Sequence, residues 1–557
     1  MHKTEQQGEQ DAEYQRARIG THPAEAEQHL GRMRHQQRER AVQQDGGHER
    51  RKADHERGGG SGVKRQHTNA DSKVFHAGFL GRGWQGPYVA QTVSRLKARG
   101  RWRCYVRSRI IAPLGGTRGI MGEQLNPAQT QEILHIEGLT HDGRGVARHA
   151  GKTVFVSGAL PGEDVGIRLL RSHPRHDEAA VTTIVQASPE RVSPLCPHFG
   201  ACGGCALQHL TPAAQLAAHA RRLEETLRRI GKSTARRWLP PVESAPWGYR
   251  SRARLAVRRE PTSGAILVGF RREESAHLEP LEHCPVLVPA LAPLPAELRC
   301  GLERLSGPAI PHEIWLAAGD EGIGIGFCFR QTVGDAERAQ LQGLGAALGA
   351  QIGFGTQAAR EPPRWESPPP QLHYSPEEGT TLAFAPWDFT QANRVVNRHL
   401  LSSVLELLAP GPEDQVLDLF CGIGNFTVPL ARRAAAVLGV ESSAQHLDVA
   451  RENARRNGIG NCSFERADLF SVEGVAALPR NRYRLAVLDP PRAGAAAVCK
   501  QARALGLRGI AYVSCDTATL ARDAALLREG GFKLQGAGVL DMFPHTAHAE
   551  SVALFTR

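Results

Sequence analysis

The amino-acid sequence predicts a multidomain α/β protein, with a small N-terminal β-barrel, a central α+β domain and a C-terminal doubly wound sheet. The chain of 557 residues is long enough for roughly three or four domains. Short strands separated by glycine-containing turns begin near residue 127, and strand and helix patterns alternate from about Pro386. We therefore expect four segments, 1–120, 121–187, 188–385 and 386–557, of which the first lacks a packed core.

The first 120 residues are basic and show little apolar periodicity. They contain 23 Lys or Arg against 12 Asp or Glu, which leaves 46 against 45 in the remainder. A segment of this kind cannot bury enough apolar surface to offset its chain entropy, so we predict disorder. It is either a basic arm for nucleic acid or, the interpretation we favour, a non-native extension upstream of a true start at Met121.

Neither a membrane span nor a secretory signal is expected. No apolar run approaches the roughly 18 residues that suggest a transmembrane helix, and the N-terminus has no apolar signal core. We therefore expect a cytoplasmic protein without a membrane partner.

The stretch "EILHIEGLTHDGRGVARHAGKTVFVSGALPGEDVGIRLL" alternates short strands with turns at HDGRG, HAGK and LPGED. This pattern is typical of a small closed β-barrel. Such barrels often bind oligonucleotides, although many are only structural.

A cysteine cluster follows in "CPHFGACGGCALQHL", with C-x5-C-x2-C spacing. In a reducing compartment, clustered thiols favour a metal over disulfides. The Gly203–Gly204 pair allows a tight turn, and a more distant cysteine in "EHCPVL" can complete the set, although it could also be only a buried thiol. The candidate ligands are Cys196, Cys202, Cys205 and Cys284. Their spacing suits a structural zinc and an iron–sulfur cluster equally well.

Residues 221–272 contain 14 Lys or Arg against four Glu. Such an excess favours a phosphate-binding surface, because each neutralised phosphate releases condensed counterions, although a solvated face has the same composition. Tyr249 and Trp247 could stack on bases or simply pack.

The C-terminal third has strand-like and helix-like segments in alternation. The strand-like segments are QVLDLF, AAVLGVE, CSFERAD, YRLAVLD, GIAYVSC and SVALF, and the helical ones are HLLSSVLELL, HLDVARENARRN and LARDAALLREG. Because doubly wound sheets bind ligands at the carboxyl ends of their strands, functional residues are expected directly after each strand.

The first such strand is followed by "DLFCGIGNF", where Gly422 and Gly424 allow a tight turn close to a ligand. Glu441 ends the next strand, where a carboxylate can accept both hydroxyls of a ribose, and Asp468 after the third could bond an adenine amine. Thr427 occupies the third glycine position of the dinucleotide fingerprint. This favours S-adenosylmethionine (SAM) over NAD.

The fourth strand ends in "LDPPRAG". An Asp-Pro-Pro at this place also occurs in methyltransferases that act on exocyclic amines, where an aromatic residue normally follows the prolines. Here Arg492 follows, which disfavours amine methylation.

A cysteine at a strand–helix junction, Cys515 in "YVSCD", suits a different reaction. Carbon 5 of a pyrimidine is too weak a nucleophile to attack the SAM methyl unaided, and a thiolate added at carbon 6 makes it enolate-like. We expect the following helix N-terminus to lower the thiol pKa, and Glu550 before the last strand to remove the carbon-5 proton. Without further context, Cys515 would be a buried thiol and Glu550 a surface acid.

Six motifs supply that context: "FTQANRVVN", "DLFCGIGNF", "GVES", "LDPPRAG", "YVSCD" and "FPHTAHAESVALF". Together they resemble the RNA uracil-C5 methyltransferase family, over essentially residues 122–557. The resemblance implies that Cys515 is the nucleophile and Glu550 the base, and that the four clustered cysteines hold a [4Fe-4S] cluster. The residues implied to contact SAM or to hold the reacting groups are Gln391, Phe420, Asn425, Glu441, Asp468 and Asp489.

The barrel resembles the TRAM domain of RNA-modifying enzymes, and its presence together with the cluster favours the branch that acts on 23S ribosomal RNA. We expect a monomer, and the 120-residue extension departs from the family pattern. The alternatives are a tRNA uracil-C5 methyltransferase and a non-enzymatic, cluster-containing RNA-binding protein. A radical-SAM methylthiotransferase is disfavoured, because it uses three cysteines at C-x3-C-x2-C.

Overall fold

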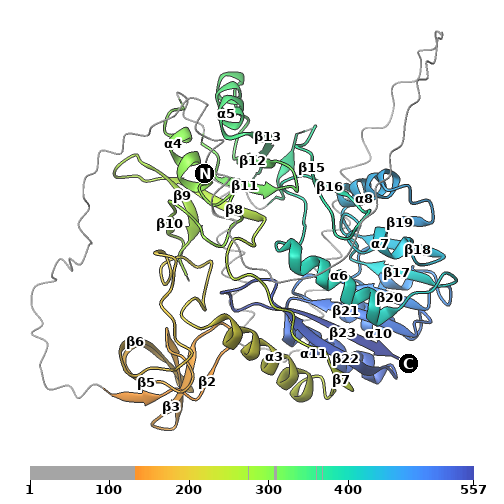
Figure 1. The fold of residues 1–557 in the computed structure, drawn as a ribbon, viewed down its shortest axis with the longest axis horizontal. Helices are drawn as coiled ribbons and strands as arrows, with labels where there is room; N and C mark the ends of the chain where they lie inside the picture. Colours follow the sequence, from red (N-terminus) through yellow and green to blue (C-terminus); the bar gives the residue numbers. More distant parts are fainter. Residues whose placement is uncertain (1–131, 274, 306–309, 359–360, 367) are drawn as a thin grey trace, which may run out of the picture. The chain divides into compact units, whose positions relative to one another are not determined.

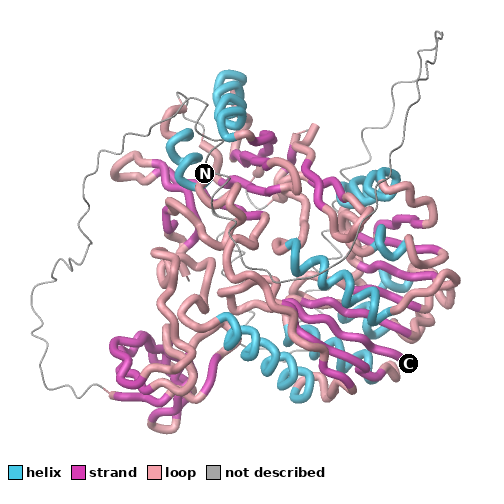
Figure 2. The backbone as a smooth tube through the Cα atoms, in the orientation of Figure 1, coloured by secondary structure: helices cyan, strands magenta, loops and turns pink. Residues whose placement is uncertain are grey.

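The computed structural model describes residues 132–273, 275–305, 310–358, 361–366 and 368–557. The disorder predicted for residues 1–120 and the predicted start of the barrel at residue 121 lie outside these ranges. Among the helices described, none is both long enough and apolar enough to cross a membrane. The described chain forms three large sheets and one small one, with helices concentrated in the C-terminal third (Figure 2).

The first sheet has six strands in the order β1-β5-β6-β4-β3-β2. Their bounds are β1 Ile133–His135, β2 Gly138–Leu139, β3 Gly145–His149, β4 Lys152–Ser157, β5 Asp164–Ser172 and β6 His176–Gln186. The strands curl around a small apolar core that includes Val154, Val156 and Val165 (Figure 1). This alternation of buried and exposed side chains explains the period-two pattern of the sequence.

The turns predicted in this sheet are confirmed. Thr140, directly before HDGRG, accepts the Arg144 backbone N–H on its Oγ1 at 2.8 Å. Between β3 and β4, Ala150 and Gly151 have φ values of 46° and 79°, as a tight hairpin turn requires. The LPGED turn ends at Glu163, whose side chain is 0 % exposed.

The second sheet has seven strands in the order β10-β9-β8-β11-β12-β13-β14. Their bounds are β8 Arg252–Arg259, β9 Ile266–Arg271, β10 Leu278–Pro280, β11 Glu313–Ala318, β12 Ile323–Phe329, β13 Ala350–Thr356 and β14 Arg364–Trp365. Helices α4 (Leu294–Leu302) and α5 (Asp335–Leu348) pack on it. A separate two-stranded sheet joins β15 (Leu372–Tyr374) to β16 (Leu382–Phe384).

The third sheet has eight strands in the order β19-β18-β17-β20-β21-β23-β22-β7. Its bounds are β17 Gln415–Leu419, β18 Ala436–Glu441, β19 Cys462–Arg466, β20 Leu485–Leu488, β21 Gly509–Ser514, β22 Lys533–Leu540, β23 Glu550–Thr556 and β7 Arg237–Trp238. Strands β17 to β21 run parallel, whereas β23 is antiparallel to both of its neighbours. The predicted parallel sheet is therefore confirmed, with an antiparallel hairpin on one side.

Six helices from the C-terminal third alternate in sequence with the strands of this sheet. They are α6 Arg394–Leu408, α7 Thr427–Ala431, α8 Ala444–Arg456, α9 Val472–Ala476, α10 Ala496–Gln501 and α11 Thr517–Glu529. For α6, α8 and α11 the start follows from the sequence, since Asn393, Ser443 and Asp516 each accept a backbone N–H of the first turn.

Helix α3 (Pro212–Arg229), from much earlier in the chain, also packs against the third sheet. Its N-cap is Thr211, and proline occupies its first turn. Leu223 and Leu227 of α3 lie in the same apolar core as Leu520 and Leu527 of α11. Residues that follow the cysteine cluster in sequence thus contribute to the core beneath the C-terminal sheet.

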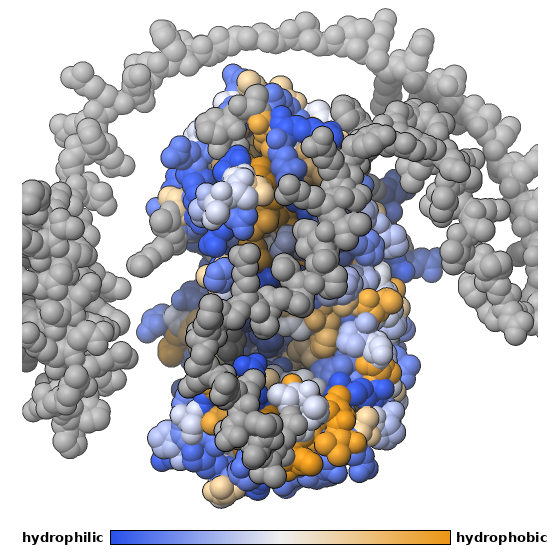
Figure 3. All heavy atoms as spheres, turned by 90° about the vertical axis from the view of Figure 1, so that its left-hand side faces the viewer, coloured by the Kyte–Doolittle hydropathy of each residue, from blue (hydrophilic) through white to orange (hydrophobic). Residues whose placement is uncertain are grey.

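Most of the basic residues between 221 and 272 are exposed, with three exceptions. Arg222 donates to the carbonyls of His141 and Ala547, both at 2.9 Å. Arg250 and Arg252 also make hydrogen bonds to backbone carbonyls, and burial lowers the pKa of Arg252 to about 10. A space-filling view shows a largely hydrophilic face interspersed with apolar side chains (Figure 3).

Candidate active site and cysteine centre

The carboxyl edge of the third sheet collects most of the residues predicted to form the active site. Each parallel strand ends there, and a predicted site residue stands at or just beyond each end. These residues are Phe420 and Asn425 after β17, Glu441 at the end of β18, Asp468 after β19, Asp489 after β20 and Cys515 after β21. Gln391 reaches the same edge from the loop before α6, and its amide nitrogen lies 3.3 Å from Asp489 Oδ2.

Cys515 and Glu550 stand opposite each other across two neighbouring strands. The antiparallel pairing of β21 with β23 aligns Ser514 with Ser551. The next position of that register places Cys515 opposite Glu550, at the edge where the parallel strands end. Glu550 is 2 % exposed, so this acid belongs to the interior and not to the surface.

Burial and neighbouring acids govern the protonation of this pair. Burial, and then the nearby Asp489, raise the pKa of Glu550 well above its ordinary value. Burial raises the pKa of Cys515 to about 11, with Glu550 as the next cause, while Arg492 acts in the opposite direction.

The expectation that the α11 N-terminus lowers the Cys515 pKa is therefore wrong for the free protein. The main reason is burial, followed by the charge of Glu550. In addition, the carboxylate of Asp516, the N-cap of α11, accepts the backbone N–H groups of Ala518 and Thr519 at 3.0 and 2.8 Å. A negative side chain already occupies the positive end of this helix, so little of its field remains for the thiol.

Arg492 and His548 form a polar contact beside the thiol that sequence reasoning missed. Arg492 Nη2 lies 2.9 Å from His548 Nε2. Burial, and then Arg492, lower the pKa of His548, so its ring is neutral and can accept this hydrogen bond. The only cue in the sequence was the position of His548 two residues before Glu550.

The loop after β17 and the end of β18 form a polar cradle. Glu441 accepts the backbone N–H of Gly422 at 3.4 Å and those of Ser442 and Ser443 at 2.8 and 3.0 Å. Gly422 has φ 53°, and a side chain added there would meet nothing within 4 Å. The backbone of this turn therefore faces open space, into which a ligand fits.

Asp468 and two aromatic rings lie next to this cradle. Asp468 Oδ1 accepts the Phe470 backbone N–H at 3.0 Å, and the rings of Phe420 and Phe470 are 5.6 Å apart. Phe470 is 51 % exposed, so one aromatic face is free to stack on a planar ligand. Phe470 was not predicted, because nothing in its sequence context separates it from a core residue.

Asn425 is held by two side chains from elsewhere in the chain. Its Oδ1 accepts hydrogen bonds from Tyr374 Oη and Asn397 Nδ2, each at 3.0 Å. Asp418, buried beneath the same loop, accepts a hydrogen bond from Thr427 Oγ1, and burial raises its pKa to about 7. Neither Asn397 nor Asp418 was singled out from the sequence, since both lie inside regular elements.

The four cysteines predicted as ligands, here called the cysteine centre (Cys196, Cys202, Cys205 and Cys284), lie near enough for their charges to affect one another. All four are free thiols; Cys284 is buried and the other three are half-buried. Burial raises the pKa of Cys202, Cys205 and Cys284 to about 11, and each also feels the charge of at least two of the other cysteines. Four soft donors gathered in this way suit a thiolate-bound metal or cluster, which would stabilise the charged form.

Short backbone contacts hold the centre together. The Gly203 N–H donates to the Arg271 carbonyl at 3.0 Å, and a side chain at Gly203 would meet that carbonyl oxygen at 3.0 Å. The Cys196 N–H donates to Gln208 Oε1 at 3.2 Å. The absence of a side chain at Gly203 thus lets this loop lie against the end of β9.

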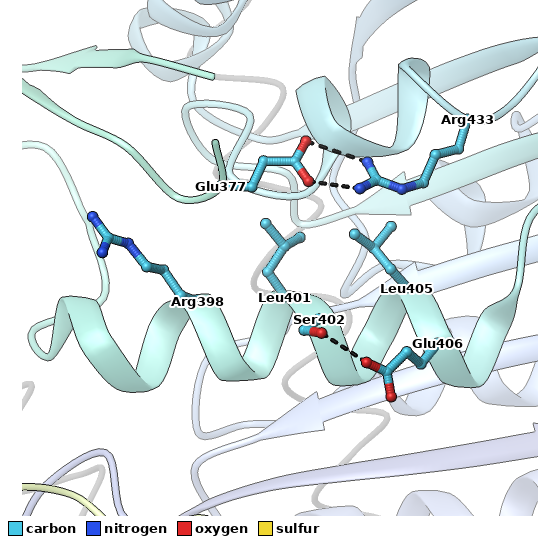
Figure 4. A pocket seen from close by; sticks show the side chains of 7 residues that line it. All are labelled: Glu377, Arg398, Leu401, Ser402, Leu405, Glu406 and Arg433. Carbon is cyan, nitrogen blue, oxygen red and sulfur yellow. Dashed lines mark hydrogen bonds and ion pairs between the residues drawn. The ribbon is translucent and has the colours of Figure 1, made fainter. Parts of the chain in front are cut away.

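Two other features of the described surface lie apart from the predicted site residues. His173, His176 and Glu178 lie close enough to share a cation, but Arg144 and Arg171 are both 3.7 Å from the Glu178 carboxylate and compete with it. A shallow pocket on α6, bounded by the Glu377–Arg433 ion pair, contains none of the predicted site residues (Figure 4).

The sheet order and the cradle at its carboxyl edge are those of a SAM-dependent methyltransferase. The structure of a tRNA (uracil-54, C5)-methyltransferase from Pyrococcus abyssi, in complex with S-adenosyl-L-homocysteine, has the same fold, with a TM-score of 0.59 and 24 % identity over 77 % of this chain and 100 % of that chain. The model of the tRNA (Uracil-5-)-methyltransferase family matches residues 383–557, and that of the TRAM domain matches residues 124–181.

Curated relatives extend the likeness to most of the chain. The 23S rRNA (uracil(1939)-C(5))-methyltransferase RlmD of Thiobacillus denitrificans is 44 % identical over 76 % of this chain and 99 % of its own length. RlmD of Alkalilimnicola ehrlichii is also 44 % identical, over 77 % of this chain and 97 % of its own. The chain therefore belongs to the RNA uracil-C5 methyltransferase family, among the RlmD relatives.

Proposed function

We propose that this protein transfers the methyl group of SAM to carbon 5 of a uridine in 23S ribosomal RNA, the substrate named for its RlmD relatives. The observation that carries the mechanism is the register that sets Cys515 opposite Glu550. One residue is a nucleophile and the other a base, and both stand at the edge where the cofactor cradle opens. Burial of an acid opposite a thiol costs free energy, so a purely structural role does not account for it.

The two residues act in sequence on the same ring. The Cys515 sulfur adds to carbon 6 of the uracil, and the electron pair of the 5,6 double bond makes carbon 5 nucleophilic. After carbon 5 has gained the methyl group, the Glu550 carboxylate removes its remaining proton. The 5,6 double bond then re-forms as the carbon–sulfur bond breaks, which releases the Cys515 thiolate.

The residues present fit SAM as the methyl donor. Glu441 would hold the ribose hydroxyls, Asp468 the adenine amine, and Phe470 would stack on the adenine. Asn425, Gln391 and Asp489 would line the methionine end and the reacting groups. When bound, SAM supplies an electrophilic methyl group next to the uracil.

The donor set of the cysteine centre fits a [4Fe-4S] cluster, held by Cys196, Cys202, Cys205 and Cys284. With four protein ligands the cluster would have no open iron position, so its contribution is structural or shapes the RNA-binding surface. The exposed arginines between residues 221 and 272 would contact phosphates around the target uridine.

A 23S rRNA fragment that carries 5-fluorouracil tests the proposal. Fluorine at carbon 5 cannot be removed as a proton, so a covalent protein–RNA adduct should accumulate with SAM and migrate slowly in a denaturing gel. The same fragment with uracil should instead take up radiolabel from methyl-labelled SAM. Adduct on tRNA alone would favour the tRNA alternative, and RNA binding without adduct would favour the non-enzymatic one.

A further inference from the structure

The loop that leads into Glu550 is tied to the cysteine centre through one residue, His545. This loop, residues 541–549, connects the end of β22 to Glu550 at the start of β23. The His545 carbonyl accepts the backbone N–H groups of Ala206 and Leu207, at 2.8 and 2.9 Å. Ala206 directly follows Cys205, so two hydrogen bonds join the cysteine centre to residues 541–549, here called the catalytic loop.

His545 holds a backbone conformation that an unsupported chain avoids. Its φ is 68°, in the left-handed region that non-glycine residues rarely adopt. Such a conformation persists only where its surroundings enforce it. The contacts that hold His545 in this conformation come from residues that lie between Cys205 and Cys284 in the sequence.

Gln215 of α3 is the first of these supports, and it is 1 % exposed. Its Oε1 accepts the His545 backbone N–H at 2.8 Å, while its Nε2 donates to the Leu207 carbonyl at 2.9 Å. The same nitrogen lies 3.2 Å from His545 Nδ1. One buried amide thus bridges both segments, so neither can shift without breaking a hydrogen bond.

Two aromatic residues complete the support. The ring of Trp247 lies 4.0 Å from that of His545, and Tyr249 Oη donates to the Pro544 carbonyl at 3.0 Å. Tyr249 packs in the same apolar core as Cys284, the fourth member of the cysteine centre. The catalytic loop therefore contacts residues next to two of the four cysteines.

We propose that His545 is a positioning residue that couples the cysteine centre to Glu550, so that an ordered centre fixes the base for the proton-removal step. This proposal deepens the proposed function and rests on it. Cys515 lies outside the coupled loop, at the end of β21. Loss of the coupling should therefore slow the removal of the carbon-5 proton while leaving thiol addition and methyl transfer largely intact.

His545→Gly is the informative variant. Glycine accepts the left-handed φ and keeps the carbonyl acceptor, but it removes the ring and frees the loop. With unmodified uracil RNA and SAM, a methylated covalent adduct should accumulate, and kcat should fall about 10²-fold with little change in KM. His545→Asn should lose less than His545→Gly, because asparagine also tolerates this conformation but leaves the backbone less free than glycine does. Asn481→Gly, at an exposed left-handed turn bonded to Leu505, is the matched control.

A second measurement needs no catalysis. Hydrogen exchange of the peptide that covers residues 541–549 should rise in Cys205→Ser and Gln215→Leu, and exchange of the peptide after Cys205 should rise in His545→Gly. The peptide of β17 should stay unchanged in all three. Reciprocal changes support the coupling, and independence of the two peptides overturns it.

The kinetic assay and the exchange measurement distinguish a failure of this coupling from a failure of the proposed function. A wild-type protein that methylates no uridine would end the proposed function, while the exchange data would still decide the coupling. Wild-type turnover by His545→Gly, without adduct, would overturn the coupling even if methylation is confirmed.

Discussion

Cys515 and Glu550 face each other from adjacent antiparallel strands, one residue beyond the aligned pair Ser514 and Ser551. A nucleophile and a base that act on neighbouring ring carbons need this kind of spacing. Because Glu550 begins β23 and Cys515 directly follows β21, the backbone ladder of one sheet brings the two residues together. The first two predictions follow from this arrangement.

Cys515→Ser should reduce methyl transfer by more than about 10³-fold, because a hydroxyl does not ionise to a useful nucleophile near neutral pH. The measurement is transfer of labelled methyl to a 23S rRNA fragment. Cys462→Ser, a half-buried thiol on β19, should retain activity. A Cys515→Ser variant with full turnover would end the assignment of the nucleophile.

Glu550→Gln should leave the first two chemical steps intact and slow the last, with a loss in kcat of about 10² to 10⁴. A denaturing gel should then show methylated RNA attached to the protein without any need for fluorinated substrate. If product forms at the wild-type rate, another group removes the proton.

The rate of thiol modification should rise with pH. With a pKa of about 11 in the free protein, the Cys515 thiolate fraction grows about tenfold for each pH unit below that value. Alkylation of the Cys515 peptide by iodoacetamide, followed by mass spectrometry between pH 7 and pH 9, measures this dependence.

Asp516→Asn should shift that profile to lower pH by about half a unit, because asparagine still caps α11 but removes the negative charge. Arg492→Ala should shift it in the opposite direction, since Arg492 lowers the Cys515 pKa. An unchanged profile in Asp516→Asn would show that the cap charge does not offset the helix field.

Cys284→Ala should lose bound metal and melt at a lower temperature than the wild type. Iron, zinc and acid-labile sulfide content distinguish a cluster from a single zinc ion, and thermal unfolding reports the stability. Cys328→Ala, which removes a buried thiol from β12, is the matched control and should keep its metal. A Cys284→Ala variant with full metal content, stability and rRNA affinity would contradict the assignment.

Glu163→Ala should destabilise the first sheet by about 3–5 kcal/mol, because it leaves Arg191 without its buried partner. Arg191 donates to both carboxylate oxygens, at 2.5 and 2.8 Å. Glu137→Ala, which breaks an exposed pair with Arg148 at 3.9 Å, should cost less than about 1 kcal/mol. Chemical denaturation followed by a probe in the first sheet compares the two variants.

The same carboxylate predicts the acid sensitivity of that sheet. Burial alone would raise the pKa of Glu163, but Arg191 and the backbone N–H groups of Leu160 and Ser188 hold it below its ordinary value of 4.5. A lowered pKa in the folded state means that the stabilisation is complete above 4.5 and is lost as the pH falls through the folded value. Glu163→Gln should remove this pH dependence.

The sequence predicted the C-terminal sheet well because its strands and helices alternate with strong apolar patterns and clear caps. It missed β22, since the two glycines and single lysine of KLQGAGVL depress its strand propensity, and pairing with β23 and β7 and packing against α3 stabilise it. The central sheet was predicted only as a class. Its neighbours are mostly consecutive along the chain, and only the pairing of β8 with β11 joins strands that other strands separate in sequence.

Site residues that stand at strand ends were predicted, whereas those brought together by tertiary packing were missed. Cys515, Glu441 and Asp468 stand at strand ends, which periodicity reveals. His545 and Gln215 meet only through the packing of α3 against the C-terminal sheet, and no spacing in the chain encodes that contact. The wrong expectation for the Cys515 pKa has the same origin, since burial and opposing charges depend on the folded neighbourhood.

The short strand β7 protects one edge of the C-terminal sheet. Its two residues, Arg237 and Trp238, cover the outer edge of β22. A fragment that began at residue 386 would leave that edge bare, with backbone groups ready to pair with a second molecule. Excision at the apparent boundary should therefore yield an aggregating product, and a soluble catalytic fragment should require the earlier segment to be supplied in cis or added back as a peptide.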